Sequence, residues 1–125
     1  MCRLGTPGFV DSLKAGLVIG LPPVMKAARK EVAEKVTAEV FRGDKRICLA
    51  ISDPDAGSDV AGITCTAKLS DCGKFYIVNG TKKWITNGTF CDYFVTAVRT
   101  GVKGIPGISL LLIERSEGIE LIFRT

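Results

Sequence analysis

The sequence predicts an α+β protein in which a short helical N-terminal segment is followed by an antiparallel, β-barrel-like domain. Two observations carry this prediction. Apolar residues recur at helical spacing before Gly43, whereas after Gly43 short β-prone runs alternate with turn residues. The chain has 125 residues, enough for one domain with a core of its own. We therefore divide it into a helical part, residues 1–45, and a β part, residues 46–125.

Two helices are expected in the first part. Residues 11–19 carry an apolar stripe at helical spacing, and the glycine and prolines of Gly20-Leu21-Pro22-Pro23 are expected to interrupt that helix. Residues 28–41 form the second helix and end before Gly43, a suitable stop. Its apolar face is predicted to consist of Val32, Val36, Val40 and Phe41.

The second part is expected to consist of short strands. They are predicted over residues 46–51, 62–69, 75–78, 83–86, 92–99, 108–113 and 119–123. Asp71-Cys72-Gly73-Lys74 and Asn79-Gly80 are both hairpin signals, and Ser116-Glu117-Gly118 is a turn before the last run. Strict alternation along 62–69 places one set of side chains on one side of the sheet: Ile63, Cys65, Ala67 and Leu69.

Composition excludes several classes of function. The net charge of +4 is mild and the basic residues are scattered, so we expect no nucleic-acid partner. Apolar runs are too short for a bilayer, and we expect neither a membrane span nor a signal peptide. Five cysteines without CxxC spacing favour reduced thiols inside a cell over a disulfide or zinc framework. The absence of histidine rules out a Ser-His-Asp or Cys-His hydrolase within this chain.

Two dense polar segments are the candidate site. The first, residues 51–60, combines Gly57 with the hydroxyls of Ser52 and Ser58 and with three aspartates. It has three interpretations: a polar surface turn, an anion site built from backbone N–H groups, or a metal site. The aspartates do not follow the calcium-loop pattern, and we expect no metal.

The second segment, residues 79–88, contains Trp84, the single tryptophan of the chain. Trp84 is interpreted either as a core residue or as a flat wall for an aromatic ligand. If 83–86 is a strand, the Thr86 hydroxyl lies on the same side as the indole. Lys82 and Lys83 are expected to lie on a solvated face.

The two segments, in this order, resemble the signatures of the acyl-CoA dehydrogenase family. Residues 49–60 resemble a strand followed by Thr or Ser, an acid, Pro and x-Ala-Gly-Ser-Asp, and residues 78–88 resemble N-G-x-K-x-W-I-T-N-G. Gly20-Leu21-Pro22-Pro23-Val24 upstream, and Asp92-Tyr93-Phe94-Val95 and Gly107-Ile108-Ser109-Leu110 downstream, also fit. The resemblance covers roughly residues 15–115.

The resemblance implies a flavoprotein oxidoreductase of fatty acid metabolism (β-oxidation) that dehydrogenates acyl-CoA thioesters at the α,β position. It implies that Ser52 bonds the flavin ring, that Trp84 packs beside the isoalloxazine, and that Thr86 reaches the flavin N5 edge. Ser58 is placed near the FAD pyrophosphate and the pantetheine chain of the acyl-CoA substrate. The implied FAD-binding set is Leu49, Ala50, Ile51, Ser52, Gly57, Ser58, Trp84, Ile85 and Thr86.

Further expectations follow from the same resemblance. The electron acceptor is an electron-transfer flavoprotein or another acceptor, and the complete protein is a homo-oligomer. Ser52 and Asp53 stand where Thr and Glu are commoner in the family. The family's catalytic glutamate lies beyond Thr125, so no catalytic residue is assigned. The 125-residue chain is expected to be an inactive fragment, with the end of the N-terminal helical domain in 1–45 and a truncated middle β-domain in 46–125.

Two other functions remain open on the sequence: a non-catalytic β-domain module, and a related flavoprotein acting on another substrate. The expected location is intracellular, with mitochondrion, peroxisome and bacterial cytoplasm all compatible.

Overall fold

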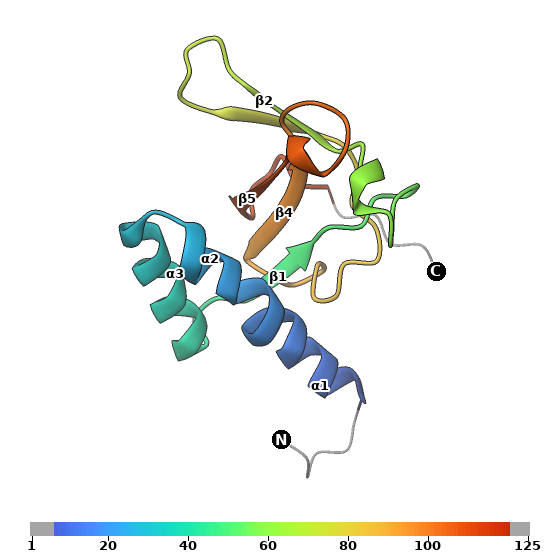
Figure 1. Ribbon diagram of the computed structural model, residues 1–125. Coiled ribbons are helices and arrows are strands. Elements are labelled where there is room, and N and C mark those ends of the chain that lie inside the picture. The colour runs from blue at the N-terminus through green and yellow to red at the C-terminus, as the bar shows by residue number, and fades with distance from the viewer. Residues whose placement is uncertain (1–6, 121–125) are drawn as a thin grey trace. The chain divides into compact units, whose positions relative to one another are not determined.

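The structure, a computed structural model, describes residues 7–120. Helical segments come first along the chain and a five-stranded sheet follows, which confirms the predicted α+β class (Figure 1). By internal contacts the chain forms two compact units. The first holds the described residues through Leu49, Thr86–Val95, and the described residues from Leu112 on. The second holds Ala50–Ile85 and Thr96–Leu111. The domain boundary expected between residues 45 and 46 stays a prediction.

The first helix is longer than predicted. It runs through α1 (Pro7–Leu13), the π-helix η1 (Lys14–Gly20) and α2 (Leu21–Ala27), seen as one coiled ribbon in Figure 1. The predicted interruption at Gly20 and the two prolines is wrong. The Leu21 N–H bonds the Gly16 carbonyl, so the helix widens there. Pro22 and Pro23 then fall in the first turn of α2, directly after the widened turn, and neither has an N–H to donate to that turn.

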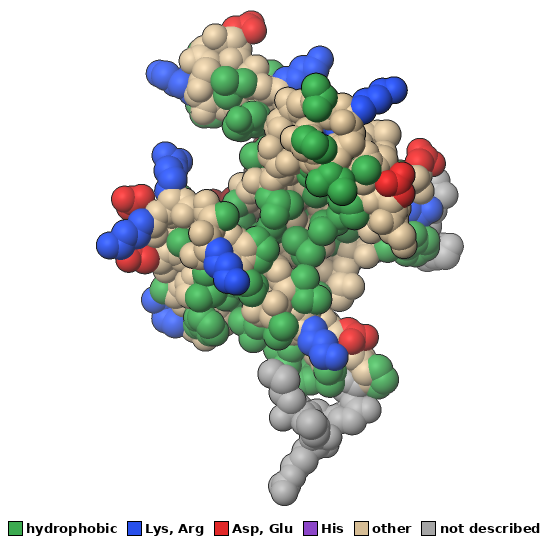
Figure 2. Space-filling view, viewed as in Figure 1, with side chains coloured by type: hydrophobic (Ala, Val, Ile, Leu, Met, Phe, Trp, Pro, Cys, Tyr) green, Lys and Arg blue, Asp and Glu red, His purple; other side chains and the backbone are tan. Residues whose placement is uncertain are grey.

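The expectation that the apolar runs are too short for a bilayer is wrong for this helix, because it is uninterrupted. Pro7–Ala27 has 21 residues and is long and apolar enough, by length and composition alone, to cross a bilayer. Core helices of soluble proteins pass the same test, and Leu21 and Val24 are buried here. Hydrophobic side chains reach the surface of the molecule in the view of Figure 2. The exposed large hydrophobic residues of this helix are Phe9, Val18, Ile19 and Met25.

Helix α3 (Lys30–Arg42) packs against α2 and completes the core of the first unit. It ends as predicted at Gly43, whose φ of 80° is left-handed. The predicted apolar face is confirmed for Val36 and Val40 but wrong for Phe41, which is 66% exposed. The buried residues of this core are Leu21, Val24, Val36, Val40, Ile47, Tyr93 and Val95.

The strands are β1 (Ile47–Ala50), β2 (Thr66–Leu69), β3 (Tyr76–Asn79), β4 (Tyr93–Arg99) and β5 (Ile108–Glu114). Their order is β1-β4-β2-β3, and β5 also pairs with β4. β2 and β3 form the predicted antiparallel hairpin, with Leu69 opposite Tyr76. β2 meets β4 in parallel, with Thr66 opposite Arg99. The sheet is therefore mixed, and the strand order leaves it open.

Two predicted strands differ from the structure. Residues 83–86 form a bend and the start of a turn. Asn79-Gly80 accordingly does not close a hairpin, since no strand follows it. Ile119 and Glu120 lie outside any strand, after a turn in which the Ile119 N–H bonds the Ser116 carbonyl. The rest of the predicted last strand, residues 121–123, lies outside the described residues.

The core of the second unit follows the predicted alternation. Ile63, Cys65 and Ala67 are buried, whereas Leu69 at the hairpin end is 55% exposed. The Arg99 guanidinium ties the loops around this core by donating to four carbonyls at 2.7–3.1 Å: those of Ala61, Ile63, Val102 and Gly104. The 3-10 turns η2 (Val60–Gly62) and η3 (Ile105–Gly107) are thereby fixed on either side of one side chain.

Candidate functional site

The first polar segment is a tight turn built around Asp53. The Asp53 N–H bonds the Ala56 carbonyl at 2.9 Å, and the Ala56 N–H bonds back at 3.3 Å. Pro54, the second residue of this four-residue turn, presets the φ that the turn requires. The Asp53 side chain turns inward, where its Oδ2 accepts the N–H groups of Thr64 at 2.5 Å and Cys65 at 2.8 Å. One of the three aspartates therefore faces away from any ligand of this loop.

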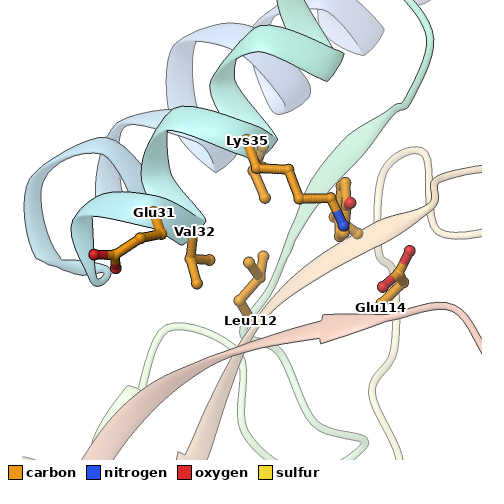
Figure 3. Close-up of a pocket in the computed structure, with 7 residues that line it drawn as sticks. Glu31, Val32, Lys35, Leu112 and Glu114 are labelled. Atoms are coloured by element: carbon orange, nitrogen blue, oxygen red, sulfur yellow. The ribbon is translucent and has the colours of Figure 1, made fainter.

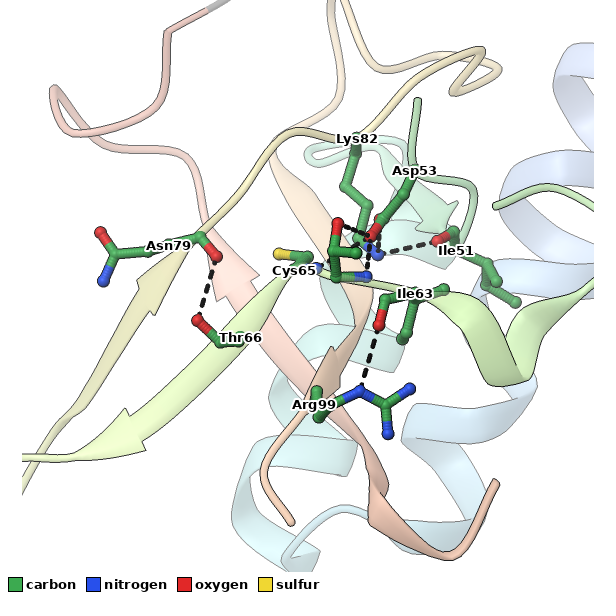
Figure 4. Close-up of polar contacts among 9 residues, drawn as sticks. Ile51, Asp53, Ile63, Cys65, Thr66, Asn79, Lys82 and Arg99 are labelled. Carbon is green, nitrogen blue, oxygen red and sulfur yellow. Dashed lines mark hydrogen bonds and ion pairs between the residues drawn. The ribbon is translucent and has the colours of Figure 1, made fainter. Parts of the chain in front are cut away.

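Lys82 reaches into the same position from the second segment. Its Nζ lies 2.6 Å from Asp53 Oδ1 and 2.7 Å from the Ile51 carbonyl oxygen (Figure 4). The side chains of Lys82 and Asp53 are 13% and 0% exposed. The expectation of a solvated Lys82 is therefore wrong: the ammonium is satisfied by a carboxylate and a carbonyl, which allows its burial.

The ionisation of Asp53 follows from these contacts. Burial alone raises the pKa of its carboxyl, but the hydrogen bonds from Lys82, Cys65 and Thr64 outweigh burial and lower the pKa below the usual 3.8. Asp53 is thus a carboxylate at neutral pH, paired with a lysine ammonium.

The second segment does not run as the predicted strand. Trp84 has a φ of 60°, rare for a bulky residue and of order 1–3 kcal/mol in strain. The inference that Thr86 shares a strand face with Trp84 is therefore wrong. The preceding residue is bound to the first segment, since the Lys83 N–H donates to the Ser52 carbonyl at 2.9 Å. The indole itself is 82% exposed, with the Lys83 ammonium 4.9 Å from its ring centre.

Gly80 allows the second segment to approach β2. Its φ is 146°, and a Cβ built there would lie 2.6 Å from the Cys65 Cα. A side chain does not fit at this distance. Since the Cys65 N–H also holds Asp53, the two segments are joined both at Gly80 and at Lys82.

Thr86 and the turn that follows it belong to the first unit. Arg115 secures this turn, with its Nε 2.6 Å from the Cys91 carbonyl and a terminal nitrogen 2.8 Å from the Gly88 carbonyl. Asn87, at a φ of 69°, donates to the Ser12 carbonyl at 2.7 Å, while its buried Oδ1 has no hydrogen-bond partner among the described residues.

Two buried thiols lie beneath this turn. Cys48 Sγ and Cys91 Sγ are 3.0 Å apart. The hydrogen bond with Cys91, together with burial, raises the pKa of Cys48. The hydrogen bond with Cys48 and the Arg115 guanidinium outweigh burial and lower the pKa of Cys91. The described cysteines are free thiols, as the sequence predicted.

The structure brings most of the predicted residues into one unit. Ala50, Ile51, Ser52, Gly57, Ser58, Trp84 and Ile85 all belong to the second unit, whereas Leu49 and Thr86 belong to the first. Within the second unit Ala50 is buried, Ile51, Ser52 and Ile85 are half-buried, and Gly57, Ser58 and Trp84 are exposed. The backbone bond between residues 83 and 52 is what joins Ser52 to the Trp84 segment.

Sequence reasoning missed Lys82 and Thr64 as parts of this arrangement. Lys82 and Asp53 are 29 residues apart, and neither helical nor strand periodicity links them. The available signal was an aspartate three residues after a buried strand, because a buried carboxylate needs a cation or N–H donors.

A separate hollow lies on the first unit. It has a volume of about 350 Å³. Val32 and Leu112 lie between Glu31 on one side and Lys35 and Glu114 on the other (Figure 3). Tyr93, whose hydroxyl donates to Glu39 at 2.7 Å, also lines it. None of the predicted site residues does.

The exposed indole of Trp84, joined through Lys83 to the Ser52 turn, offers an apolar plane and nearby polar groups to a flat ligand. Residues 48–123 match the acyl-CoA dehydrogenase middle domain. The chain therefore belongs to the acyl-CoA dehydrogenase family.

Known relatives support this assignment along most of the chain. An acyl-CoA dehydrogenase of Emericella nidulans, apdG, is 55% identical over 113 residues, which are 90% of this chain and 26% of that protein. The chain thus spans about a quarter of that relative's length.

Two solved structures are similar in fold. A probable acyl-CoA dehydrogenase of Mycobacterium abscessus matches with a TM-score of 0.89 and 35% identity, over 97% of this chain and 32% of that one. The acyl-CoA dehydrogenase of Bacillus anthracis, solved in complex with FAD, matches with a TM-score of 0.76 and 31% identity, over 86% and 18%.

Proposed function

We propose that this chain carries part of the FAD site of an acyl-CoA dehydrogenase, an enzyme that oxidises acyl-CoA thioesters at the α,β position. The observation that carries the proposal is Trp84, which is 82% exposed and whose neighbour Lys83 is bonded to Ser52. A large flat side chain at the surface is a favourable wall for an aromatic ligand, and a hydroxyl beside it can bond the ligand's polar edge.

The residues present fit this cofactor in chemical character. Trp84 offers an apolar plane for the isoalloxazine, and Ser52 a hydroxyl for the ring edge. Ser58, in an exposed turn, suits the pyrophosphate and the pantetheine chain of the substrate. Thr86 is proposed to bond the N5 edge, and the rest of the lining comes from Leu49, Ala50, Ile51, Gly57 and Ile85.

The Asp53–Lys82 pair removes one of the three negative charges that the first loop would otherwise present to a phosphate-bearing ligand. Three aspartates in an anion site would repel the anion. Asp53 is buried and neutralised by Lys82, which leaves two exposed aspartates, Asp55 and Asp59, around the exposed Ser58. Bound FAD would supply the acceptor for the two electrons removed from the substrate. The contribution of this chain is to hold the ring and to hydrogen-bond its edge.

Further proposals rest on the family. The substrate is an acyl-CoA, and the electrons pass to an electron-transfer flavoprotein or another acceptor. The complete protein is a homo-oligomer and acts inside the cell. We also propose that these 125 residues alone do not turn over acyl-CoA, because no residue of this chain is assigned as the base that removes the α-proton.

The test is an FAD titration monitored by Trp84 fluorescence. Stacking of the flavin on the single tryptophan should quench its emission, and flavin absorbance should co-elute with the chain on gel filtration. Trp84→Leu should lose the binding, whereas Tyr76→Leu, which removes an aromatic residue that is 51% exposed on β3, should keep it.

Absence of quenching and of co-eluting flavin in the folded chain would favour a non-catalytic β-domain module instead. Anaerobic addition of acyl-CoAs to the FAD-loaded chain tests turnover. Bleaching of the flavin at the rate of a competent enzyme would refute the proposal that the isolated chain is inactive.

A further inference from the structure

We propose that Lys82 and Asp53 are positioning residues that fix Ser52 relative to Trp84 before any cofactor binds. The identity of the ligand rests on the proposed function, but the positioning itself is a property of the second unit alone.

The contacts surround Ser52 on both sides. Lys82 Nζ bonds the Ile51 carbonyl at 2.7 Å and the Asp53 carboxylate at 2.6 Å, and the Lys83 N–H bonds the carbonyl of Ser52 itself at 2.9 Å. Lys82 and Lys83 of the second segment thus hold three consecutive residues of the first segment, Ile51, Ser52 and Asp53. Each of these bonds fixes the distance between the two loops at Ser52.

The carboxylate that receives Lys82 is itself immobile. Asp53 Oδ2 accepts two backbone N–H groups, those of Thr64 and Cys65, and the Asp53 side chain has no exposed surface. An ammonium and a carboxylate buried together are strongly disfavoured apart, because each would lack its counter-charge. The pair is therefore a fixed, buried contact between the two segments rather than a mobile surface ion pair.

Trp84 lies two residues after Lys82 and is held in a strained backbone conformation. A bulky residue at a φ of 60° persists only where the surrounding chain fixes it. When Lys82 is released, residues 82–84 can relax toward unstrained angles, and the indole loses its fixed position. Pre-ordering these groups removes part of the entropy loss on ligand binding.

The experiment compares Lys82→Met, which keeps the aliphatic stem but removes the charge, with Lys82→Arg, which restores a cation. Lys74→Met, an exposed lysine in the β2–β3 turn, is the surface control. Val36→Ala controls for general destabilisation, because Val36 lies in the core of the first unit. Circular dichroism verifies folding, and Lys82→Gln is the milder variant if Lys82→Met does not fold.

Two measurements are made on each variant. Steady-state anisotropy and acrylamide quenching of Trp84 report the mobility of the indole without any ligand. FAD titration then reports affinity. We expect lower anisotropy and roughly tenfold weaker FAD binding in Lys82→Met, the loss expected from ordering one side chain and its loop on binding. Lys82→Arg should recover both properties, and the two controls should match the wild type.

The outcomes separate this inference from the proposed function. Unchanged Trp84 anisotropy in a folded Lys82→Met or Lys82→Gln variant overturns the positioning role, whatever the FAD result. If anisotropy falls but the wild-type chain binds no FAD, the positioning role stands and the proposed cofactor site fails. Equal loss of anisotropy in Val36→Ala also overturns it, because the effect is then one of stability.

Discussion

Gly80→Ala is expected to destabilise the second unit strongly. A methyl group at this position would lie 2.6, 2.8 and 2.9 Å from the Cα, Cβ and Sγ of Cys65. The backbone φ of 146° also disfavours any L-residue. Because the Cys65 N–H bonds Asp53, a displaced Cys65 also disturbs the ion pair with Lys82.

The magnitude is the sum of two effects. Positive φ costs a non-glycine residue about 1–2 kcal/mol, and overpacking a rigid core costs about 1–3 kcal/mol. Gly80→Ala should therefore lower the free energy of unfolding by roughly 2–5 kcal/mol, a large part of the roughly 5–15 kcal/mol that stabilises a typical domain.

Two other glycines separate these effects. Gly73 has a φ of 69° but open space around it, and Gly57 has open space and no positive φ. Urea unfolding followed by circular dichroism should show a loss of about 1–2 kcal/mol for Gly73→Ala. For Gly57→Ala it should show a change within about 0.5 kcal/mol of zero. If Gly80→Ala loses no more stability than Gly73→Ala, the close contact with Cys65 is wrong.

Three further results are expected. The lowered pKa of Asp53 contributes stability above its unfolded pKa of about 3.9, and this is lost as pH falls through the folded pKa. Urea midpoints below about pH 4 should thus fall less in Asp53→Asn than in the wild type. In a Cys2→Ser background, a chromogenic disulfide reagent should label only the exposed Cys72 while the protein is folded. The buried thiols of Cys48, Cys65 and Cys91 should react only on unfolding, and their labelling in the native state would contradict their burial. Val36→Ala should lose about 2 kcal/mol in urea unfolding and Val18→Ala, at a site 62% exposed, close to none; equal losses would contradict the assigned core.

The parts of the fold that depend on local pattern could be predicted from the sequence. Helix α3 and its Gly43 end, the β2–β3 hairpin, and strands β4 and β5 are set by neighbouring residues. The failures need information from elsewhere in the chain. The helix continues past Gly20 because its turn widens ahead of the prolines, and periodicity at 3.6 residues does not reveal that change.

The site was predictable in its members but not in its geometry. Ser52 and Trp84 stand out by residue type and by motif, yet each motif alone resembles an ordinary turn. Asn79-Gly80 has the composition of a hairpin turn, but Gly80 is instead required by its contact with Cys65. The bond between Lys82 and Asp53 crosses 29 residues, and no local preference encodes it.

The buried ion pair of Lys82 and Asp53 is better explained by its role in positioning the two segments than by a gain in the free energy of unfolding. A buried ion pair gains little over apolar residues of similar volume, but removing one partner leaves an uncompensated charge and costs about 3–5 kcal/mol. Lys82→Met alone should show a loss of this size. Adding Asp53→Asn removes the remaining charge, while the amide oxygen of the new side chain can still accept the N–H groups that Asp53 held.

The double variant should therefore regain much of the stability lost in Lys82→Met, whereas the Trp84 anisotropy should stay low in both, because neither has a cation to hold the Ile51 carbonyl. If stability and anisotropy instead recover together, the indole is held by the overall stability of the unit and the ion pair has no separate positioning role. If neither recovers, the two N–H groups require a charged acceptor, and the main effect of Asp53 is on the folding of its own loop.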